Sequence, residues 1–132
     1  MHEARMLRLA LLTTALLAAL PAAAETRCGW YHNPGPGNVI LEDADGQWWL
    51  SFQGRPPVPG FDEAYTTAFD DRLRLDYQGQ PTQRYGSSCA CAEGVFDASR
   101  AEYDTVLSIT SLREIPLARC EEDPKLPPLL SQ

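Results

Sequence analysis

Four cysteines limit the folds open to this chain more than any other feature of its sequence. Two of them are one residue apart in Cys89-Ala90-Cys91, and the others, Cys28 and Cys120, lie far from this pair along the chain. An even number of cysteines in a small exported chain is typical of a disulfide framework. We therefore expect the four residues to join distant segments of one small, disulfide-stabilised fold.

The spacing of the central pair bears on how the cysteines are joined. On a strand, Cys89 and Cys91 would point to the same face about 6.6 Å apart along it, whereas the Cβ atoms of a disulfide lie about 3.8 Å apart. A bond between them is strained unless the backbone bends sharply. Two long-range bonds are then expected, each worth about 4 kcal/mol in the chain-entropy account. We favour Cys28–Cys89 with Cys91–Cys120, and the other long-range pairing stays open.

Residues 1–24 are typical of a secretory signal peptide. Arg5 and Arg8 precede an apolar run from Leu9 to Leu20, and Pro21 is followed by the small residues 22–24. The run is shorter than the roughly 20 apolar residues that a membrane-spanning helix needs. No cysteine directly follows the small residues, so a lipoprotein is not favoured. We expect cleavage after Ala24 and a soluble periplasmic or secreted product with no membrane span.

The remaining residues 25–132 are long enough for one small domain with a modest core. They carry nine basic and seventeen acidic side chains, a net charge of −8. No basic stripe is present, which argues against nucleic acid as a partner. An acidic surface keeps a protein soluble and favours basic partners. We expect a monomer whose partner is a protein or a glycan of the cell envelope.

The hydrophobic pattern predicts an all-β fold. Asp45-Gly46 is a strong hairpin signal between two short strands, and alternating apolar and polar residues indicate further strands. Five short strands suggest an antiparallel sheet curled into a small barrel or sandwich; a mixed α+β fold with one short helix is the alternative. The strands are predicted at residues 38–43, 47–53, 72–77, 88–96 and 105–113.

Proline and glycine mark the predicted connections. The turn-rich sequence predicts an ordered loop over residues 27–38 and another over residues 54–60. One or two helical turns are predicted over residues 61–69, and a polar loop over 78–87. A proline-rich tail from about residue 123 is expected to be loosely ordered.

Several short motifs together resemble a family of small exported bacterial proteins, catalogued as domain of unknown function 4087. The chain departs from the family pattern where Val39 and Ile40 replace aromatic residues, and where Ser87 and Ser88 separate Tyr85-Gly86 from Cys89. The resemblance implies export and a shared fold, and it brings no activity or catalytic residues. The motifs that carry it are 27–30, 33–38, 43–48, 53–54, 89–91, Leu117, Cys120 and Asp123.

No residue pattern predicts a catalytic, metal or cofactor site. His32 is the one histidine left after signal removal and is expected on the surface or in a loop, with no partner placed. The acidic turn at residues 43–46 lacks the glutamate that a calcium loop has at its twelfth position, where this chain has Gly54. The carboxylates Glu42, Asp43, Asp70 and Asp71 have no fixed separation. We expect no cofactor and no metal.

Aromatic residues are the candidate binding residues. Trp48 and Trp49 are adjacent on a predicted strand and must point to opposite faces. An exposed tryptophan beside Trp30 or Tyr31 would form a stacking platform for a glycan or a protein. The candidate set is Trp30, Tyr31, Trp48, Trp49 and Tyr85.

Two functions of different classes follow. The first is a non-catalytic binding module of the cell envelope that uses an aromatic patch with an acidic rim, for example an inhibitor of a basic hydrolase such as lysozyme. The alternative is a thiol-disulfide redox protein that uses Cys89 and Cys91. A redox pair needs a low thiol pKa, and the flanking residues Ser87, Ser88, Ala92 and Glu93 do not favour one.

Overall fold

A computed structural model describes residues 23–68, 74–76, 78–82 and 85–129 of the chain. Most of the predicted signal peptide lies outside the described residues. Short helices interrupt a chain that is mostly β-strand. The elements in order are β1 (Glu25–Gly35), β2 (Asn38–Asp43), β3 (Gly46–Ser51), α1 (Phe61–Ala68), β4 (Arg74–Leu75), β5 (Pro81–Thr82), β6 (Gly86–Phe96), the 3-10 helix η1 (Glu102–Asp104), β7 (Val106–Ile115) and α2 (Leu117–Glu121).

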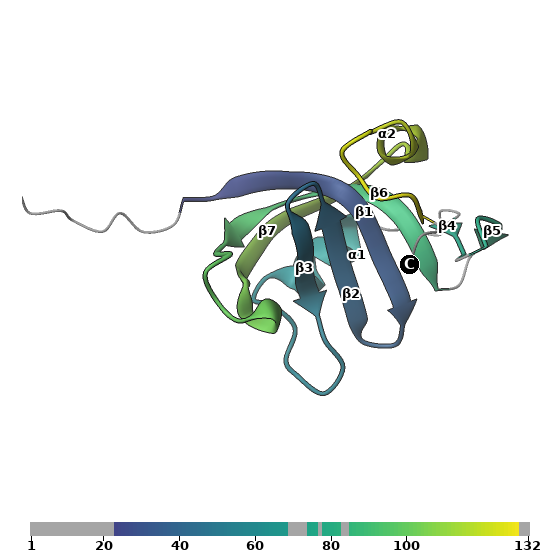
Figure 1. Cartoon of the computed structure of the whole chain (residues 1–132). Helices are drawn as coiled ribbons and strands as arrows, with labels where there is room; N and C mark the ends of the chain where they lie inside the picture. The colour runs from purple at the N-terminus through teal and green to yellow at the C-terminus, as the bar shows by residue number, and fades with distance from the viewer. Residues whose placement is uncertain (1–22, 69–73, 77, 83–84, 130–132) are drawn as a thin grey trace, which may run out of the picture.

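The strands form one antiparallel sheet, which confirms the predicted fold class. Seven strands of the described chain belong to it, in the order β3-β2-β1-β6-β4-β5, with β7 also paired to β6. Figure 1 shows how the sheet bends, so that β7 lies behind β2 and β3, and α1 packs against β7 beside the core. The sheet does not close, so the barrel or sandwich of the prediction is only approximated. The two strands beyond the predicted five are β1 and the very short β5.

The predicted hairpin is present as β2 and β3. The backbone N–H of Asp45 donates to Asp43 Oδ1 at 2.9 Å, which closes the turn locally. Gly46 has a φ of 137°, a conformation that residues with a Cβ rarely adopt. The register then pairs Leu41 with Trp48 and Ile40 with Trp49. This register sends the two tryptophans to opposite faces of the sheet, as the alternation predicted.

β1 replaces the ordered loop that the sequence predicted over residues 27–38. The strand pairs with β2 on one side and with β6 on the other, from Glu25 to Asn33 in register with residues 86–94. Its one proline, Pro34, falls near its end, where the chain turns into β2. Gly29 is required because a Cβ there would overlap the carbonyl oxygen of Glu42. Pairing on both sides therefore overrides the local turn signals.

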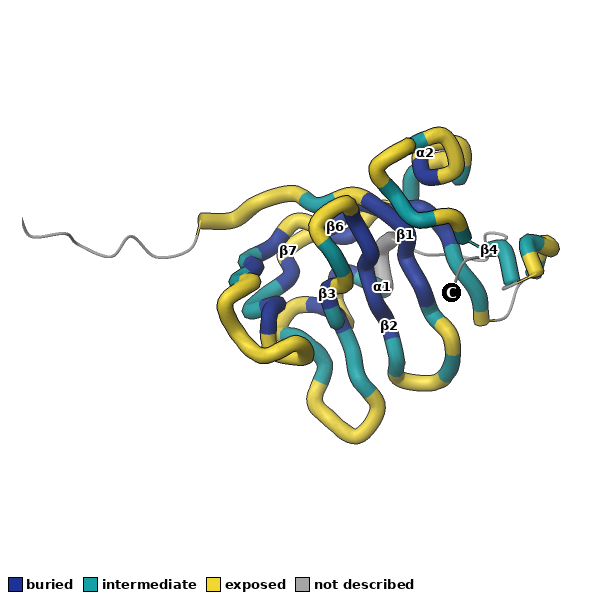
Figure 2. The backbone as a smooth tube through the Cα atoms, in the orientation of Figure 1, coloured by how far each residue is buried: buried dark blue, intermediate teal, exposed yellow. Residues whose placement is uncertain are grey.

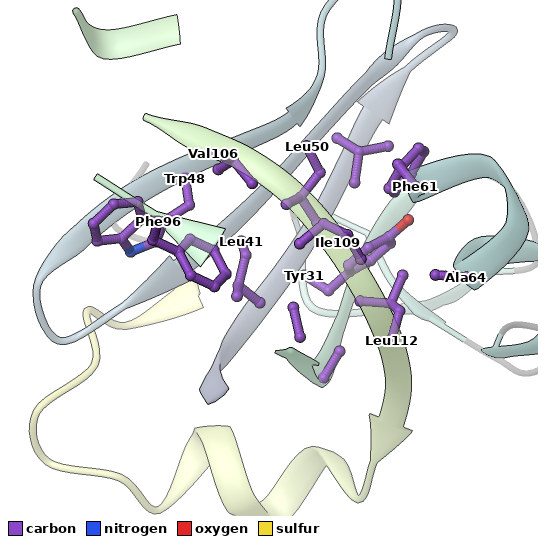
Figure 3. Packing of buried hydrophobic residues seen from close by; sticks show 13 residues of the cluster. Tyr31, Leu41, Trp48, Leu50, Phe61, Ala64, Phe96, Val106, Ile109 and Leu112 are labelled. Atoms are coloured by element: carbon purple, nitrogen blue, oxygen red, sulfur yellow. The ribbon is translucent and has the colours of Figure 1, made fainter. Parts of the chain in front are cut away.

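One face of the sheet, here called the inner face, carries the main core. Figure 3 shows its side chains gathered between β2, β3, β7 and α1. Trp48 packs edge-on against Phe96 with ring centroids 5.3 Å apart, and Arg27 covers Trp48 at 4.0 Å from the ring centroid. Arg27 also bonds Asp43 Oδ2 at 2.9 Å. The cluster contains Tyr31, Val39, Leu41, Trp48, Leu50, Phe61, Ala64, Ala90, Ala92, Phe96, Val106, Ile109 and Leu112.

The opposite face, here called the outer face, has its own smaller apolar cluster. Trp30, Cys89 and Cys120 are buried there, and Leu126 and Leu129 pack against them together with Ile115 and Leu117. The indole N–H of Trp30 donates to the carbonyl of Pro127 at 3.0 Å. Figures 1 and 2 show α2 and the residues after it lying over β1 and β6. The tail that was expected to be loosely ordered thus covers part of the outer face, up to residue 129.

The disulfides are Cys28–Cys91 and Cys89–Cys120. The favoured pairing was therefore wrong, and the alternative left open is the one present. The reason is the strand register, because Cys28 lies directly opposite Cys91 in the β1–β6 ladder. Cys89 faces Trp30 two pairs further along, where α2 brings Cys120 over it. Two disulfides indicate a non-cytoplasmic environment.

Other predicted segments agree with the structure in part. The helical turns at 61–69 appear as α1, the strand at 88–96 lies within β6, and the strand at 105–113 overlaps β7. Of the strand predicted at 72–77, only β4 and residue 76 fall among the described residues. The loop predicted at 78–87 contains β5 and the first residues of β6. In the part of the chain that the structure describes, no helix has the length and apolar character to span a bilayer.

Candidate functional site

The five candidate aromatic residues do not form one surface. Trp30, Tyr31 and Trp48 are 2 %, 0 % and 4 % exposed, so they are core residues. Trp49 is half-buried, and Tyr85 is exposed. A platform made of Trp49 with Trp30 or Tyr31 is excluded, because the outer cluster covers Trp30 and the inner core covers Tyr31.

Trp49 instead meets two aromatic residues that come from other segments. Its ring centroid lies 5.2 Å from that of Phe52 and 5.0 Å from that of Tyr103, at interplanar angles of 75° and 69°. The Phe52 and Tyr103 centroids are 4.8 Å apart. Edge-on and tilted geometries of this kind are favourable for aromatic pairs. Tyr103 remains 42 % exposed, so the three rings present an open surface.

The three rings line a groove of about 430 Å³, here called the aromatic groove. η1 carries Tyr103 to the side of β3. A proline-rich wall of residues 56–59 forms another part of the lining. Two backbone hydrogen bonds fix this wall, from Val58 N–H to the Leu50 carbonyl at 3.2 Å and from Ile109 N–H to the Pro59 carbonyl at 2.9 Å. The groove is therefore built on β3 and β7 rather than on a free loop.

The charged residues of the aromatic groove are Arg55, Arg100 and Asp104. Arg55 and Asp104 form an ion pair at 3.4 Å, and both are 46 % exposed, so the pair is a weak interaction in water. The exposed Arg100 adds a second positive charge. The groove lining thus carries more positive than negative charge, in contrast to the acidic rim that the sequence suggested.

Sequence reasoning could find part of this site. Trp49 was identified because alternation forces one of two adjacent tryptophans away from the core. Tyr103 and Arg100 were missed because they lie more than 45 residues away in the sequence, and the path of the chain alone brings them to β3. The sequence around Tyr103 does not indicate that this residue lies beside β3.

His32 is buried, which differs from the expected surface or loop position. It is 7 % exposed and lies on the outer face between Ser87 and Glu42. The carboxylates do not gather as a metal site: among the described residues no group of three or more potential ligands occurs, and Asp70 and Asp71 lie outside them. Glu42 and Asp43 point to opposite faces, since they are adjacent in β2.

The Cys-Ala-Cys pair is divided between two long-range disulfides. Cys91 is bonded to Cys28 and Cys89 to Cys120, so all four thiols are used and none is free. Cys28 is the exposed member, whereas Cys89, Cys91 and Cys120 are 1 %, 3 % and 3 % exposed. The sulfur atoms of this structure serve as cross-links and do not form a dithiol pair.

Comparison with protein families supports the family resemblance that the sequence motifs suggested. No curated protein and no solved structure matches the chain significantly. The family described as "Protein of unknown function (DUF4087)" matches residues 22–127, which are most of the chain and nearly all of its described part. This chain belongs to that family.

Proposed function

We propose that this chain is an exported binding module of the cell envelope, and that its aromatic groove holds an acidic glycan without changing it chemically. The observation that carries the proposal is the open surface of Trp49, Phe52 and Tyr103 beside Arg100. The export signal predicted at residues 1–24 and the two disulfides support the location.

The size of the groove favours a small ligand over a protein surface. Pockets for small ligands are typically about 300–1,000 Å³, and the aromatic groove has about 430 Å³. A stable protein interface buries about 1,200–2,000 Å² in total, for which the groove alone is too small. One or two sugar rings would fit a space of this kind, with a hydrogen-bearing ring face against the aromatic surface.

The charge of the groove favours an acidic ligand. Arg100 offers a planar guanidinium that binds carboxylates through two parallel hydrogen bonds. The chain has a net charge of −7, so a local excess of arginine is not a consequence of composition. A glycan with carboxylate groups fits both the aromatic rings and this arginine.

Binding of purified, disulfide-bonded protein to glycans tests the proposal. We expect co-sedimentation with insoluble peptidoglycan, and tighter binding of carboxylate-bearing oligosaccharides than of neutral ones in calorimetry. Tyr103→Ala should weaken binding about 10-fold, the effect of losing roughly 1.4 kcal/mol. Arg100→Ala should remove the preference for acidic glycans. Tyr85→Ala is the matched control, because Tyr85 is an exposed aromatic residue outside the aromatic groove.

Two results would contradict the proposal. One is the absence of retention on any glycan by folded wild-type protein. The other is equal binding by wild type and Tyr103→Ala. Retention on a lysozyme column that Tyr103→Ala leaves unchanged would instead favour the basic hydrolase as partner, held by a different surface.

A further inference from the structure

A line of hydrogen-bonded polar side chains crosses the outer face, away from the aromatic groove. Ser87 Oγ lies 2.7 Å from His32 Nδ1, and His32 Nε2 lies 3.3 Å from Glu42 Oε1. Gln47 Nε2 donates to the other oxygen of Glu42 at 2.9 Å. These residues come from β6, β1, β2 and β3, which lie side by side in the sheet. The register places Ser87 directly opposite His32, while Glu42, which is opposite Trp30, lies diagonally from His32 on the same face. The serine, the histidine and the carboxylate thus follow one another across the outer face in a row.

The hydrogen-bond partners of His32 favour one of its two neutral forms. Burial lowers the pKa of the imidazole, and the hydrogen bond and charge of Glu42 oppose this effect. At neutral pH the ring is then neutral and carries one N–H. Because Glu42 Oε1 is an acceptor, the proton belongs on Nε2, and Nδ1 is left to accept the hydroxyl proton of Ser87. This is the protonation state that a histidine base needs next to a serine nucleophile.

A separate pocket opens in front of this row. It has a volume of about 310 Å³ and shares no lining residue with the aromatic groove. Its apolar walls are Pro34, Ile40 and Leu129, and His32, Ser87 and Tyr85 line it as well. Ser87 is half-buried, so a small molecule in the pocket would meet its hydroxyl. Asp76 is the remaining charged residue among the described lining.

We propose that Ser87 is a nucleophile that hydrolyses a carboxylic ester with a small apolar acyl group, with His32 as its general base and Glu42 as the residue that orients His32. The base would act through Nδ1 and the carboxylate through Nε2, the reverse of the nitrogens used in the serine protease triad. The apolar walls select the acyl group, and the pocket volume limits its length.

The reaction balances with these groups and water. Ser87 Oγ bonds to the carbonyl carbon as its proton passes to His32 Nδ1, and the C–O bond to the alcohol then breaks as the alcohol takes that proton. Water next attacks the acyl-serine and gives a proton to Nδ1. The carboxylic acid leaves, and the proton returns to Ser87 Oγ. The hydroxyl of Tyr85, which lines the same pocket, is the candidate donor to the carbonyl oxygen as negative charge develops there.

A fluorophosphonate reagent tests the nucleophile directly. We expect intact-mass measurement of the full, disulfide-bonded protein to show one adduct per chain, located on Ser87 by peptide analysis. Ser87→Ala should abolish the adduct and the hydrolysis of p-nitrophenyl butyrate. His32→Gln should slow labelling at least about 100-fold, the lower end of general base catalysis. Ser88→Ala is the control, since the neighbouring hydroxyl lies on the inner face.

Glu42→Gln provides a second variant in case His32→Gln does not fold, because it keeps a hydrogen-bond acceptor beside Nε2. It should slow labelling without removing it. In wild type the labelling rate should fall as the pH drops through the pKa of His32, below its usual 6.5. Among the described residues, the titratable groups near His32 include Glu42 and, around the pocket, Asp76 and Tyr85.

The absence of an adduct in folded wild type, or an adduct that persists in Ser87→Ala, would overturn the inference. So would labelling that is unchanged in folded His32→Gln. These outcomes are independent of the proposed glycan binding, because Tyr103→Ala alters the aromatic groove and leaves this pocket intact.

Discussion

Trp30 and Tyr31 are neighbours in β1, yet they lie on opposite faces of the sheet in different surroundings. Tyr31 belongs to the inner core, where aliphatic and aromatic side chains fill the space between the layers. Trp30 belongs to the outer cluster, where a disulfide and the C-terminal residues cover it. Ser87 and Ser88 in β6 show the same contrast, because one faces His32 and the other is fully buried.

The contrast shows that the two faces are stabilised by different means. The inner face is largely apolar apart from Ser88 and the Arg27–Asp43 pair, so its stability comes mainly from burial and close packing. The outer face has a buried histidine, a buried glutamate and two disulfides, and pockets open beside them. Chemistry or small-molecule binding is therefore more compatible with the outer face and the sheet edge than with the core.

The largest expected change in the free energy of unfolding comes from shortening one aliphatic side chain to alanine on each face. Leu41 is 0 % exposed in the inner core, and the adjacent Ile40 faces the outer pocket. Leu41→Ala should lower the free energy of unfolding by about 4 kcal/mol, because a buried cavity remains. Ile40→Ala removes the same number of carbons but should cost about half as much, since water can enter the space left. Urea unfolding of both variants measures the difference, and equal losses would contradict the distinction between the faces.

The two disulfides should contribute similarly to stability but differ in their effect on the cover of Trp30. Replacing Cys89 and Cys120 together by alanine should lower stability by about 3–4 kcal/mol in the chain-entropy account, with the ends of this bond 31 residues apart. The tail would then be released, and Trp30 fluorescence should shift to longer wavelength. The Cys28→Ala and Cys91→Ala pair should cost a similar amount.

The control for this comparison is the environment of Trp30. Loss of Cys28–Cys91 should leave Trp30 covered, because Cys120 and Pro127 still hold the tail over it. A fluorescence shift in both double variants, or in neither, would show that the disulfide to Cys120 does not control the cover.

The sequence predicted those parts of the fold that depend on local patterns. Asp45-Gly46 indicated the hairpin of β2 and β3, and alternation indicated β6 and β7. β1 was predicted as a loop because the glycine- and proline-rich residues 33–38 at its end are a strong local turn signal, while its partner β6 is distant in sequence. The disulfide pairing was not predicted for the same reason, since it depends on the register of Cys28 with Cys91.

The candidate sites depend even more on long-range arrangement. Alternation separated Trp49 from Trp48, but no local signal connects Trp49 to Tyr103. Similarly, Glu42 and Ser87, which both contact His32, are 10 and 55 residues away from it in the sequence. Residues that meet only through sheet order are not detectable from spacing along one chain.

A smaller effect is expected from the two adjacent serines. The Ser88 hydroxyl is buried and has no hydrogen-bond partner among the described residues. Ser88→Ala should therefore raise the free energy of unfolding by about 1 kcal/mol, because a desolvated hydroxyl is removed. Ser87→Ala should lower it slightly, since His32 Nδ1 loses the bond at 2.7 Å. Thermal unfolding of both variants gives the signs, and the same sign for both would contradict their assignment to opposite environments.

The last prediction concerns the pH dependence of the free energy of unfolding, to which the adjacent residues Tyr31 and His32 contribute at opposite ends of the pH range. Burial lowers the pKa of His32 on the outer face and raises that of Tyr31 on the inner face well above 10. The folded state thus favours neutral His32, whose contribution is complete above the unfolded pKa of about 6.5 and is lost as the pH falls below it. It also favours neutral Tyr31, whose contribution is complete below about pH 10 and is lost as the pH rises above it.

Urea unfolding at a series of pH values separates these two contributions. In His32→Gln, the free energy of unfolding should fall less steeply as the pH drops below 6.5, and its behaviour at alkaline pH should not change. Tyr31→Phe should flatten the decline above pH 10 and leave the acidic side unchanged, because phenylalanine keeps the ring and cannot ionise. If either variant altered both ends, the two faces would be coupled through β1, and the assignment of the acidic effect to the outer face and of the alkaline effect to the inner face would fail.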